Sequence, residues 1–175
     1  MAGDGFALTN VENGVNFDVS GDGVPERRAW MAPGSDDAWL VLDRNGNGRI
    51  DGGKELFGTA APQSPPPDGE HKNVFLALAE FDKDDNDGNG DGRIDSQDPV
   101  FTRLRLWRDV NHNGVSEPEE LHTLSEFGIT SFELEYKLSK KSDAYGNQFR
   151  YRAKVWAGRG PKAGRWAWDV VLLGQ

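Results

Sequence analysis

The sequence predicts an α+β fold in which paired acidic loops, joined to short helices, pack against antiparallel β-strands and hairpins. Short clusters of Asp, Asn and Gly recur along the chain at loop-like spacing. Residues 73–81 carry Val74, Leu78 and Phe81 on one face of a helix. Apolar and polar residues alternate over several C-terminal segments, as they do in half-buried strands.

Composition limits the function classes. The chain has 175 residues and a formal charge of -9, which argues against binding to nucleic acids or to anionic membranes. Its 36% hydrophobic residues and six Trp favour a folded domain over disorder. The absence of Cys excludes disulfides and thiolate metal sites, and the three His lack zinc spacing. No apolar run reaches membrane-spanning length.

The N-terminus leads directly into polar sequence without the pattern of a signal peptide. We therefore expect a module taken from a longer chain, and we expect this module to be a monomer.

Residues 87–98 have the pattern of an EF-hand calcium loop, and Pro99 follows at once. Gly92 falls at loop position 6, where the chain turns sharply, and oxygen ligands fall at alternate positions. Ca²⁺ is a hard cation that takes such oxygen ligands. The expected ligands are the side chains of Asp87, Asn89, Asp91, Asp95 and Asp98 and the carbonyl of Arg93.

Residues 109–120 match the same pattern without a gap, with Gly114 at position 6. Pro118 is expected to start an exiting helix that Gly128 ends. Because only ten residues separate the two loops, the sequence predicts that they pair as one lobe. The expected ligands are the side chains of Asp109, Asn111, Asn113, Glu117 and Glu120 and the carbonyl of Val115.

Two further loops are less regular. In the first, position 12 is Lys54, which cannot bind a cation, so the next residue is the candidate closing ligand. Its expected ligands are Asp43, Asn45, Asn47, the Arg49 carbonyl, Asp51 and Glu55. In the second, half of a calcium loop competes with a Gly-rich hairpin turn that binds nothing. Its expected ligands are Asp18, Ser20, Asp22, the Val24 carbonyl and Glu26.

The chain is expected to form one calcium-binding module with four parts: strands and EF-like loops in 1–58, a Pro-rich connector in 59–72, a paired EF-hand-like lobe in 73–128, and β-hairpins in 129–175. Strands are expected near 15–19, at 39–42, 129–138, 148–156 and 166–173, with turns at 145–147 and 158–164. Asp82 and Asp84 are interpreted as a solvated acidic flank. The basic face of 148–156, next to Trp residues, is interpreted as solvated rather than as a ligand platform.

Several blocks in this order resemble a known family. They are Glu-Leu-Phe-Gly at 55–58, Asp-Pro-x-Phe at 98–101 and Leu-Arg-Leu-Trp at 104–107. Together they are similar to the self-processing module of FrpC-like RTX proteins, which are secreted bacterial proteins. The resemblance implies calcium-triggered cleavage of the Asp98–Pro99 bond, after which water or a lysine amine attacks the activated acyl group of Asp98.

The residues permit this chemistry. An Asp carboxylate can reach its own backbone carbonyl carbon and close a five-membered cyclic anhydride, and proximity supplies much of the acceleration. The alternative is that Asp98 is an ordinary N-cap with Pro99 at the first helical position. At the level of function, the alternatives are a structural or adhesive calcium-binding domain and, with less support from only two Met, a calcium sensor.

Overall fold

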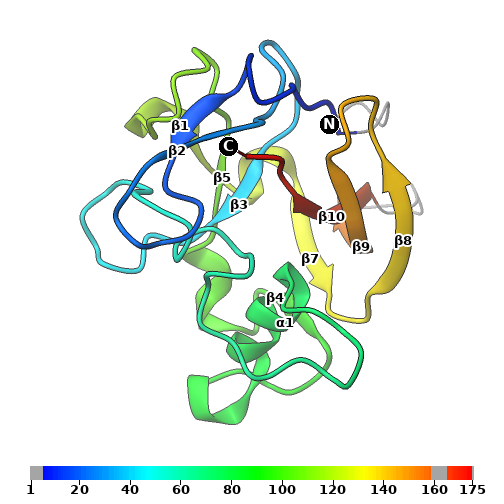
Figure 1. Ribbon diagram of the computed structural model, residues 1–175. Helices are drawn as coiled ribbons and strands as arrows, with labels where there is room; N and C mark the ends of the chain where they lie inside the picture. Colours follow the sequence, from blue (N-terminus) through cyan, green and yellow to red (C-terminus); the bar gives the residue numbers. More distant parts are fainter. Residues whose placement is uncertain (1–5, 159–164, 175) are drawn as a thin grey trace.

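Antiparallel β-structure dominates the computed structural model, which describes residues 6–158 and 165–174 (Figure 1). A hairpin pairs β1 (Val15–Phe17) with β2 (Glu26–Arg28). A second sheet has the order β3-β5-β6, with β3 at Trp39–Val41, β5 at Arg105–Trp107 and β6 at Leu121–Thr123.

The largest sheet has five strands in the order β10-β9-β7-β4, and β8 also pairs with β9. Its strands are β4 (Arg93–Asp95), β7 (Ile129–Glu133), β8 (Lys137–Ser142), β9 (Gln148–Ala157) and β10 (Arg165–Val171). Strand β9 buries alternate residues, because Phe149, Tyr151, Ala153 and Val155 face the core and Arg150, Arg152 and Lys154 do not.

Among the described residues, α1 (Val74–Ala79) is the one α-helix. The side chain of Asn73 accepts hydrogen bonds from the amides of Phe75 and Leu76 and so caps its N-terminus. The remaining helical segments are single 3₁₀ turns: Glu80–Asp82, Asp84–Asn86, Pro99–Thr102, Pro118–Glu120 and Ser125–Phe127.

The predicted α+β fold with helix-flanked, paired EF-hand-like loops is therefore wrong. No EF-hand helix pair occurs in the part of the chain that the structure describes. The expected exiting helix after Pro118 lasts one 3₁₀ turn, because the next residues form β6 and pair with β5. Tertiary pairing overrides the local helix signal here, and the acidic loops are flanked by short strands and turns instead.

Most of the predicted strands, in contrast to the predicted helices, correspond to strands of the structure. The expected strands at 39–42, 148–156 and 166–173 correspond to β3, β9 and β10. The expected strand at 129–138 is divided into β7 and β8. The turn at 145–147 joins β8 to β9, with Gly146 at a positive φ of 96°. The expected turn at 158–164 falls almost entirely outside the described residues.

Two hydrophobic clusters hold the sheets together. The larger one joins α1, the inner face of β9 and the ends of the acidic loops, with Leu78, Ile94 and Leu104 fully buried. The smaller one is aromatic and lies between the β1–β2 hairpin and the β3-β5-β6 sheet. In it, Trp30 lies 5.1 Å from Phe17 and 5.5 Å from Trp107, measured between ring centroids.

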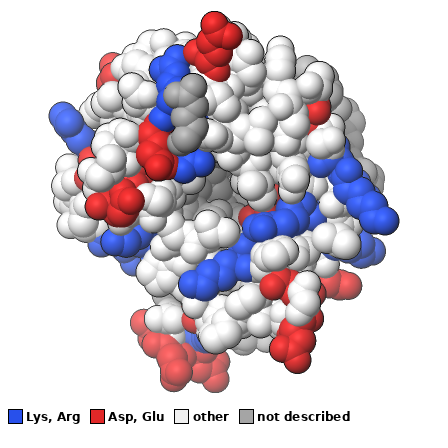
Figure 2. Space-filling model, viewed as in Figure 1, with Lys and Arg blue, Asp and Glu red and all other residues white. Residues whose placement is uncertain are grey.

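Charge is distributed unevenly over the surface. Figure 2 shows Asp and Glu side chains gathered at the lower tip of the molecule, where Figure 1 places the segment before β4. Lys and Arg gather over the side that carries β8 and β9. The acidic tip includes exposed Asp84, Asp85 and Asp87.

Candidate metal centre

The acidic loops share one hydrogen-bonding pattern around their first carboxylate. In the 43–55 loop, Asp43 Oδ1 accepts from the Gly46 amide at 2.7 Å and Oδ2 accepts from the Gly48 amide at 2.8 Å. In the 109–120 loop, Asp109 accepts in the same way from Asn113 at 3.0 Å and from Gly114 at 2.9 Å. The first carboxylate therefore holds the sharp turn of each loop.

The 18–26 loop repeats the pattern in a shorter form. Asp18 Oδ1 accepts from the Gly21 amide at 2.7 Å, and Oδ2 accepts from the Gly23 amide at 2.8 Å. Burial opposes ionisation of Asp18, but these amide donors lower its pKa below the usual value. This loop is also the connection of the β1–β2 hairpin, which was the alternative interpretation.

The expected later ligands of that loop do not converge. Glu26 lies in β2 and pairs with Arg28, while Val24 is 61% exposed. The Ser20 hydroxyl donates to Asp18 Oδ1, and Asp22 accepts from the Val24 amide.

In the loop that ends at Asp98, the first carboxylate is that of Asp82. Asp82 Oδ1 accepts from the Asp91 amide at 3.2 Å, and Oδ2 accepts from the Gly92 amide at 2.9 Å. Asp82 is 8% exposed, whereas Asp87 is exposed and adopts a left-handed conformation with φ of 61°. Six residues, 83–88, thus lie between loop positions 1 and 3, where a standard loop has one, so this segment contains an insert of five residues.

We refer to this loop as the 82–98 loop. Sequence reasoning missed Asp82 because a twelve-residue window ending at Asp98 begins at Asp87. One signal was available: Asp82 directly follows the apolar Phe81, as Asp43 follows Leu42.

The middle ligand candidates lie where the sequence places them along each loop. Asn89, Asn45 and Asn111 each accept the amide two residues later, and each is exposed. The side chains of Asp91, Asn47 and Asn113 accept the amides of Arg93, Arg49 and Val115, respectively. The position-9 candidates Asp51 and Glu117 accept from the side-chain amides of Asn47 and Asn113, while Asp95 accepts from the Gln97 amide.

The closing carboxylates differ between loops. Both oxygens of Glu55 accept amides, from Arg44 at 3.0 Å and from Asp51 at 2.7 Å. Both oxygens of Glu120 also have donors: the Val110 amide at 2.8 Å and the Trp107 indole at 3.2 Å. These two glutamates are 5% and 4% exposed.

Asp98 is 1% exposed, and only one of its oxygens is paired. Oδ2 accepts from the Asp95 amide at 2.9 Å, and Oδ1 is buried without a hydrogen-bond partner. Burial raises the pKa of Asp98 above its usual value, and the negative charges of Asp82 and Asp95 raise it further. A buried carboxylate oxygen of this kind suits a cation, which would supply both a partner and a counter-charge.

No three His, Asp or Glu side chains lie together as a ready-made metal cluster in residues 6–158 and 165–174. The loops combine carboxylates with asparagine and backbone carbonyl oxygens, which is the donor set of calcium rather than of zinc. The residues of the 82–98 and 109–120 loops fit Ca²⁺ in donor type and order.

The loops do not pair as the sequence predicted. The 109–120 loop contacts the 43–55 loop, because the Ile50 amide donates to Ser116 Oγ at 2.7 Å. Asp109 Oδ2 also accepts from the Trp30 indole at 2.9 Å. The 82–98 loop instead pairs Ile94 with Phe132 of β7. The lobe expected within 73–128 is thus replaced by pairing between distant parts of the chain.

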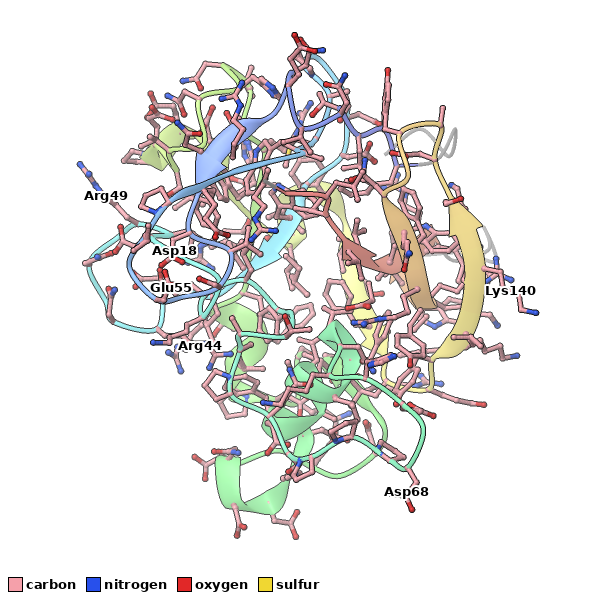
Figure 3. The ribbon with its side chains drawn as sticks, in the orientation of Figure 1. Asp18, Arg44, Arg49, Glu55, Asp68 and Lys140 are labelled. Atoms are coloured by element: carbon pink, nitrogen blue, oxygen red, sulfur yellow. The ribbon has the colours of Figure 1, made fainter. Side chains whose placement is uncertain are left out.

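The 18–26 loop joins the same group. The Gly53 amide donates to the Asp18 carbonyl at 2.6 Å, and Figure 3 shows Asp18 and Glu55 side by side where the two loops meet. Arg49 points away from both. Three loops therefore form one cluster, and the 82–98 loop stands apart from it.

The Asp98–Pro99 bond lies at the start of the 3₁₀ turn Pro99–Thr102. Asp98 occupies the N-cap position, but its side chain makes no capping hydrogen bond and turns back into the loop. The Asp98 carbonyl oxygen accepts from the Phe101 amide at 3.0 Å. Pro99 is exposed. Capping alone therefore does not explain the buried Asp98 carboxylate.

A comparison of the sequence with protein families gives a match to the SPM domain over residues 1–165. The chain belongs to the SPM domain family. It is also 40% identical over 148 residues to the iron-regulated protein FrpA of Neisseria meningitidis serogroup C. The aligned part covers 84% of this chain and 12% of FrpA, so this module matches about an eighth of that bacterial relative.

These matches confirm the relationship to FrpC- and FrpA-like proteins on which the sequence resemblance rested. None of the helices among the described residues has the length and apolar character needed to cross a bilayer.

Proposed function

We propose that this protein is a calcium-binding module of a secreted bacterial protein and that it cleaves its own chain at Asp98–Pro99 once calcium is bound. The observation that carries this proposal is the Asp98 carboxylate, which is buried with Oδ1 unpaired directly before the proline. Membership of the SPM domain family supports it.

The calcium part of the proposal rests on the acidic loops. Each of the four loops buries or half-buries its first carboxylate and turns at a glycine, and three of them end in a buried carboxylate. Bound Ca²⁺ would neutralise the carboxylates of the 82–98 loop and hold that loop in one geometry. Extracellular calcium is about millimolar, in the range of weak extracellular calcium sites, which agrees with a secreted location.

The cleavage step uses the residues of the chain itself. The Asp98 carboxylate attacks the Asp98 carbonyl carbon and forms the new C–O bond of a five-membered anhydride. The C–N bond to Pro99 breaks, and the proline nitrogen takes a proton and leaves as a secondary amine. The Phe101 amide, 3.0 Å from the carbonyl oxygen, stabilises the negative charge that develops there.

The anhydride then opens in one of two ways. Water returns Asp98 as a free C-terminal residue, or a lysine amine attacks and forms an amide with the Asp98 acyl group. Both outcomes leave Pro99 as a new N-terminus, which is exposed already in the uncut chain.

Intact-mass measurement with and without added calcium tests the proposal. Fragments 1–98 and 99–175 should appear with calcium only, since Asp-Pro occurs once in the chain. Asp98→Asn keeps the side-chain size but removes the nucleophilic charge, so it should remain uncut. Asp84→Asn, on the exposed acidic tip, is the matched control and should be cut normally.

An uncut wild-type chain refutes the cleavage proposal. If calcium still raises the unfolding temperature of that chain, the module is a structural calcium-binding domain. If calcium changes neither the mass nor the unfolding temperature, the calcium proposal is refuted as well.

A further inference from the structure

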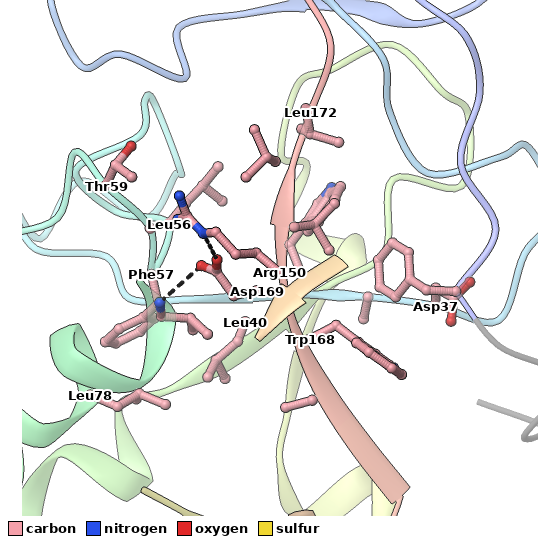
Figure 4. A pocket seen from close by; sticks show the side chains of 18 of the residues that line it. Asp37, Leu40, Leu56, Phe57, Thr59, Leu78, Arg150, Trp168, Asp169 and Leu172 are labelled. Atoms are coloured by element: carbon pink, nitrogen blue, oxygen red, sulfur yellow. Dashed lines mark hydrogen bonds and ion pairs between the residues drawn. The ribbon is translucent and has the colours of Figure 1, made fainter. Parts of the chain in front are cut away.

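A cavity of about 940 Å³ lies beside β10, and neither Asp98 nor Pro99 is among the residues that line it. Figure 4 shows part of its lining. One wall is β10, and the other is formed by residues 37–40 and 56–60. Leu78, Ile129 and Phe132 of the main core also line it. Its size is that of a ligand site, and neither the acidic loops nor the proposed cleavage uses it.

The cavity runs along the edge of β10, not over one face. Every residue from 165 to 172 lines it. Because successive side chains of a strand point to opposite faces, a cavity over one face would contact alternate residues only. Strand β10 is also the end strand of its sheet, and no described strand pairs with its outer edge.

The facing wall is also formed by consecutive residues next to the end strand of a sheet. Residues 37–40 all line the cavity, and they lead into β3, which is the end strand of the β3-β5-β6 sheet. The bridge between Val41 and Leu56 closes the edge of β3 just beyond this point. Among the described residues, the end strands of two different sheets thus border the same cavity.

The side chains around the cavity are mainly apolar, including Leu40, Leu56, Phe57, Trp168 and Leu172 (Figure 4). The one buried ion pair shown there is already complete. Asp169 accepts from Arg150 Nε at 3.0 Å and from the Val74 amide at 3.1 Å.

A positive charge marks one end of the cavity. Arg165, the first residue of β10, lines it and makes no ion pair with the described residues. Long apolar edge strands are templates for pairing with another strand, and natural proteins normally block them. The sequence of β10, Arg-Trp-Ala-Trp-Asp-Val-Val, has only one acidic residue, and that residue is engaged by Arg150.

We propose that this cavity receives an extended polypeptide segment that pairs with the outer edge of β10 as an added strand. The segment would have apolar residues at alternate positions, which fill the cavity, and an acidic residue at the end beside Arg165. Eight residues of such a strand span about 26 Å, the length of the lining stretch 165–172. Backbone hydrogen bonds give the affinity in this mode of recognition, and the side-chain pockets give the specificity.

Gly58 provides a sharp test. It lines the cavity, its φ is not in the left-handed region, and a Cβ added there meets no atom within 4 Å. Gly58→Phe should therefore fill the cavity without disturbing the fold. Lys140→Phe is the matched control, because it adds the same ring to the exposed outer strand β8 (Figure 3).

The probe is a displayed library of random ten-residue peptides, selected on the wild-type chain. Enriched peptides should alternate apolar residues, should bind Lys140→Phe like the wild type and should lose binding to Gly58→Phe. Hydrogen exchange should show slowed amides in β10 when an enriched peptide is bound. An Arg165→Glu variant, which reverses the charge at the cavity end, should weaken the acidic peptides selectively.

Three results would overturn the proposal. One is a selection that yields no peptide with different affinities for the wild-type chain and for Gly58→Phe. For this result to count, Gly58→Phe and Lys140→Phe must both unfold at the wild-type temperature. Another is peptide binding that leaves β10 amide exchange unchanged. The third is saturable binding of a small apolar probe, cis-parinaric acid, with no peptide binding, which assigns the cavity to small molecules instead.

Discussion

The assignment of Asp82 as the first carboxylate of the 82–98 loop can be tested with two matched substitutions. Asp82→Asn and Asp87→Asn each remove one negative charge from the same segment, so the formal charge of the chain changes equally. Only Asp82 accepts loop amides, from Asp91 and Gly92. Asp87 accepts no hydrogen bond with its side chain among the described contacts, and Asn tolerates its left-handed conformation.

The expected size of the effect follows from these contacts. In Asp82→Asn an NH₂ group replaces one acceptor oxygen, so one of the two amide bonds is lost. A hydrogen bond to a charged group contributes about 1.5–3 kcal/mol. At about 1.4 kcal/mol per tenfold change, calcium binding to this loop should weaken roughly 10- to 100-fold. Asp87→Asn, on the exposed insert, should stay within about 0.5 kcal/mol of wild type.

Calcium titration followed through the Gly92 amide by NMR isolates this loop from the others, because that amide donates to Asp82. Intact mass should be recorded on each sample so that only uncut protein is compared. Weakening by Asp87→Asn alone would show that the ligand window begins at residue 87, so that residues 87–98 form the binding loop. Equal weakening by both substitutions would refute a special role of Asp82.

Three further substitutions test two contacts of the other loops and the cleavage step. Trp30→Phe removes the indole donor of Asp109 and should lower the free energy of unfolding by about 1–3 kcal/mol, measured by urea denaturation; an unchanged midpoint contradicts this role. Ser116→Ala leaves the Ile50 amide without its acceptor and should cost a similar amount, about 1–3 kcal/mol, together with weaker calcium binding to both loops by calorimetry. Asp98→Glu should keep calcium binding but stop cleavage in the mass assay, since the longer chain no longer favours a five-membered ring. Efficient cleavage of that variant would contradict the anhydride route.

The sequence predicted the strands of the β9–β10 region well, because alternation on a half-buried sheet is set by local pattern. Phe149, Tyr151, Ala153 and Val155 were expected on one face, and they are buried there. The prediction of helices around the loops was wrong. Those segments are short, and the secondary structure that they adopt depends on partners far along the chain, such as the pairing of β6 with β5.

The candidate ligands were found by spacing, and spacing alone misplaced one of them. Five extra residues between Asp82 and Asn89 shift Asp82 out of any twelve-residue window that ends at Asp98. Only the fold brings the Asp82 carboxylate back to the Asp91 and Gly92 amides. The pairing of the 109–120 and 43–55 loops was equally hidden, because the Ile50–Ser116 contact joins residues 66 positions apart. The 82–98 and 109–120 loops follow each other in sequence, yet each pairs with a different part of the chain.

The position of the Asp98–Pro99 bond between two sheets has a consequence for the products of cleavage. Strand β4 ends three residues before the bond and pairs with β7, while β5 begins six residues after it and pairs with β3. Cutting the bond therefore places β3 and β4 on one fragment and their partners, β5 and β7, on the other.

Both fragments also share the main core. Leu42, Leu78 and Ile94 belong to the first fragment, and Leu104 and Phe132 belong to the second, yet all lie in one buried cluster. We therefore expect the fragments to stay associated after cleavage. Native mass spectrometry should give the mass of the whole chain, plus one water if the anhydride is hydrolysed, when denaturing mass spectrometry gives two fragments. Separation of the fragments under native conditions would show that the covalent link at residue 98, rather than strand pairing and the shared core, holds the two sheets together.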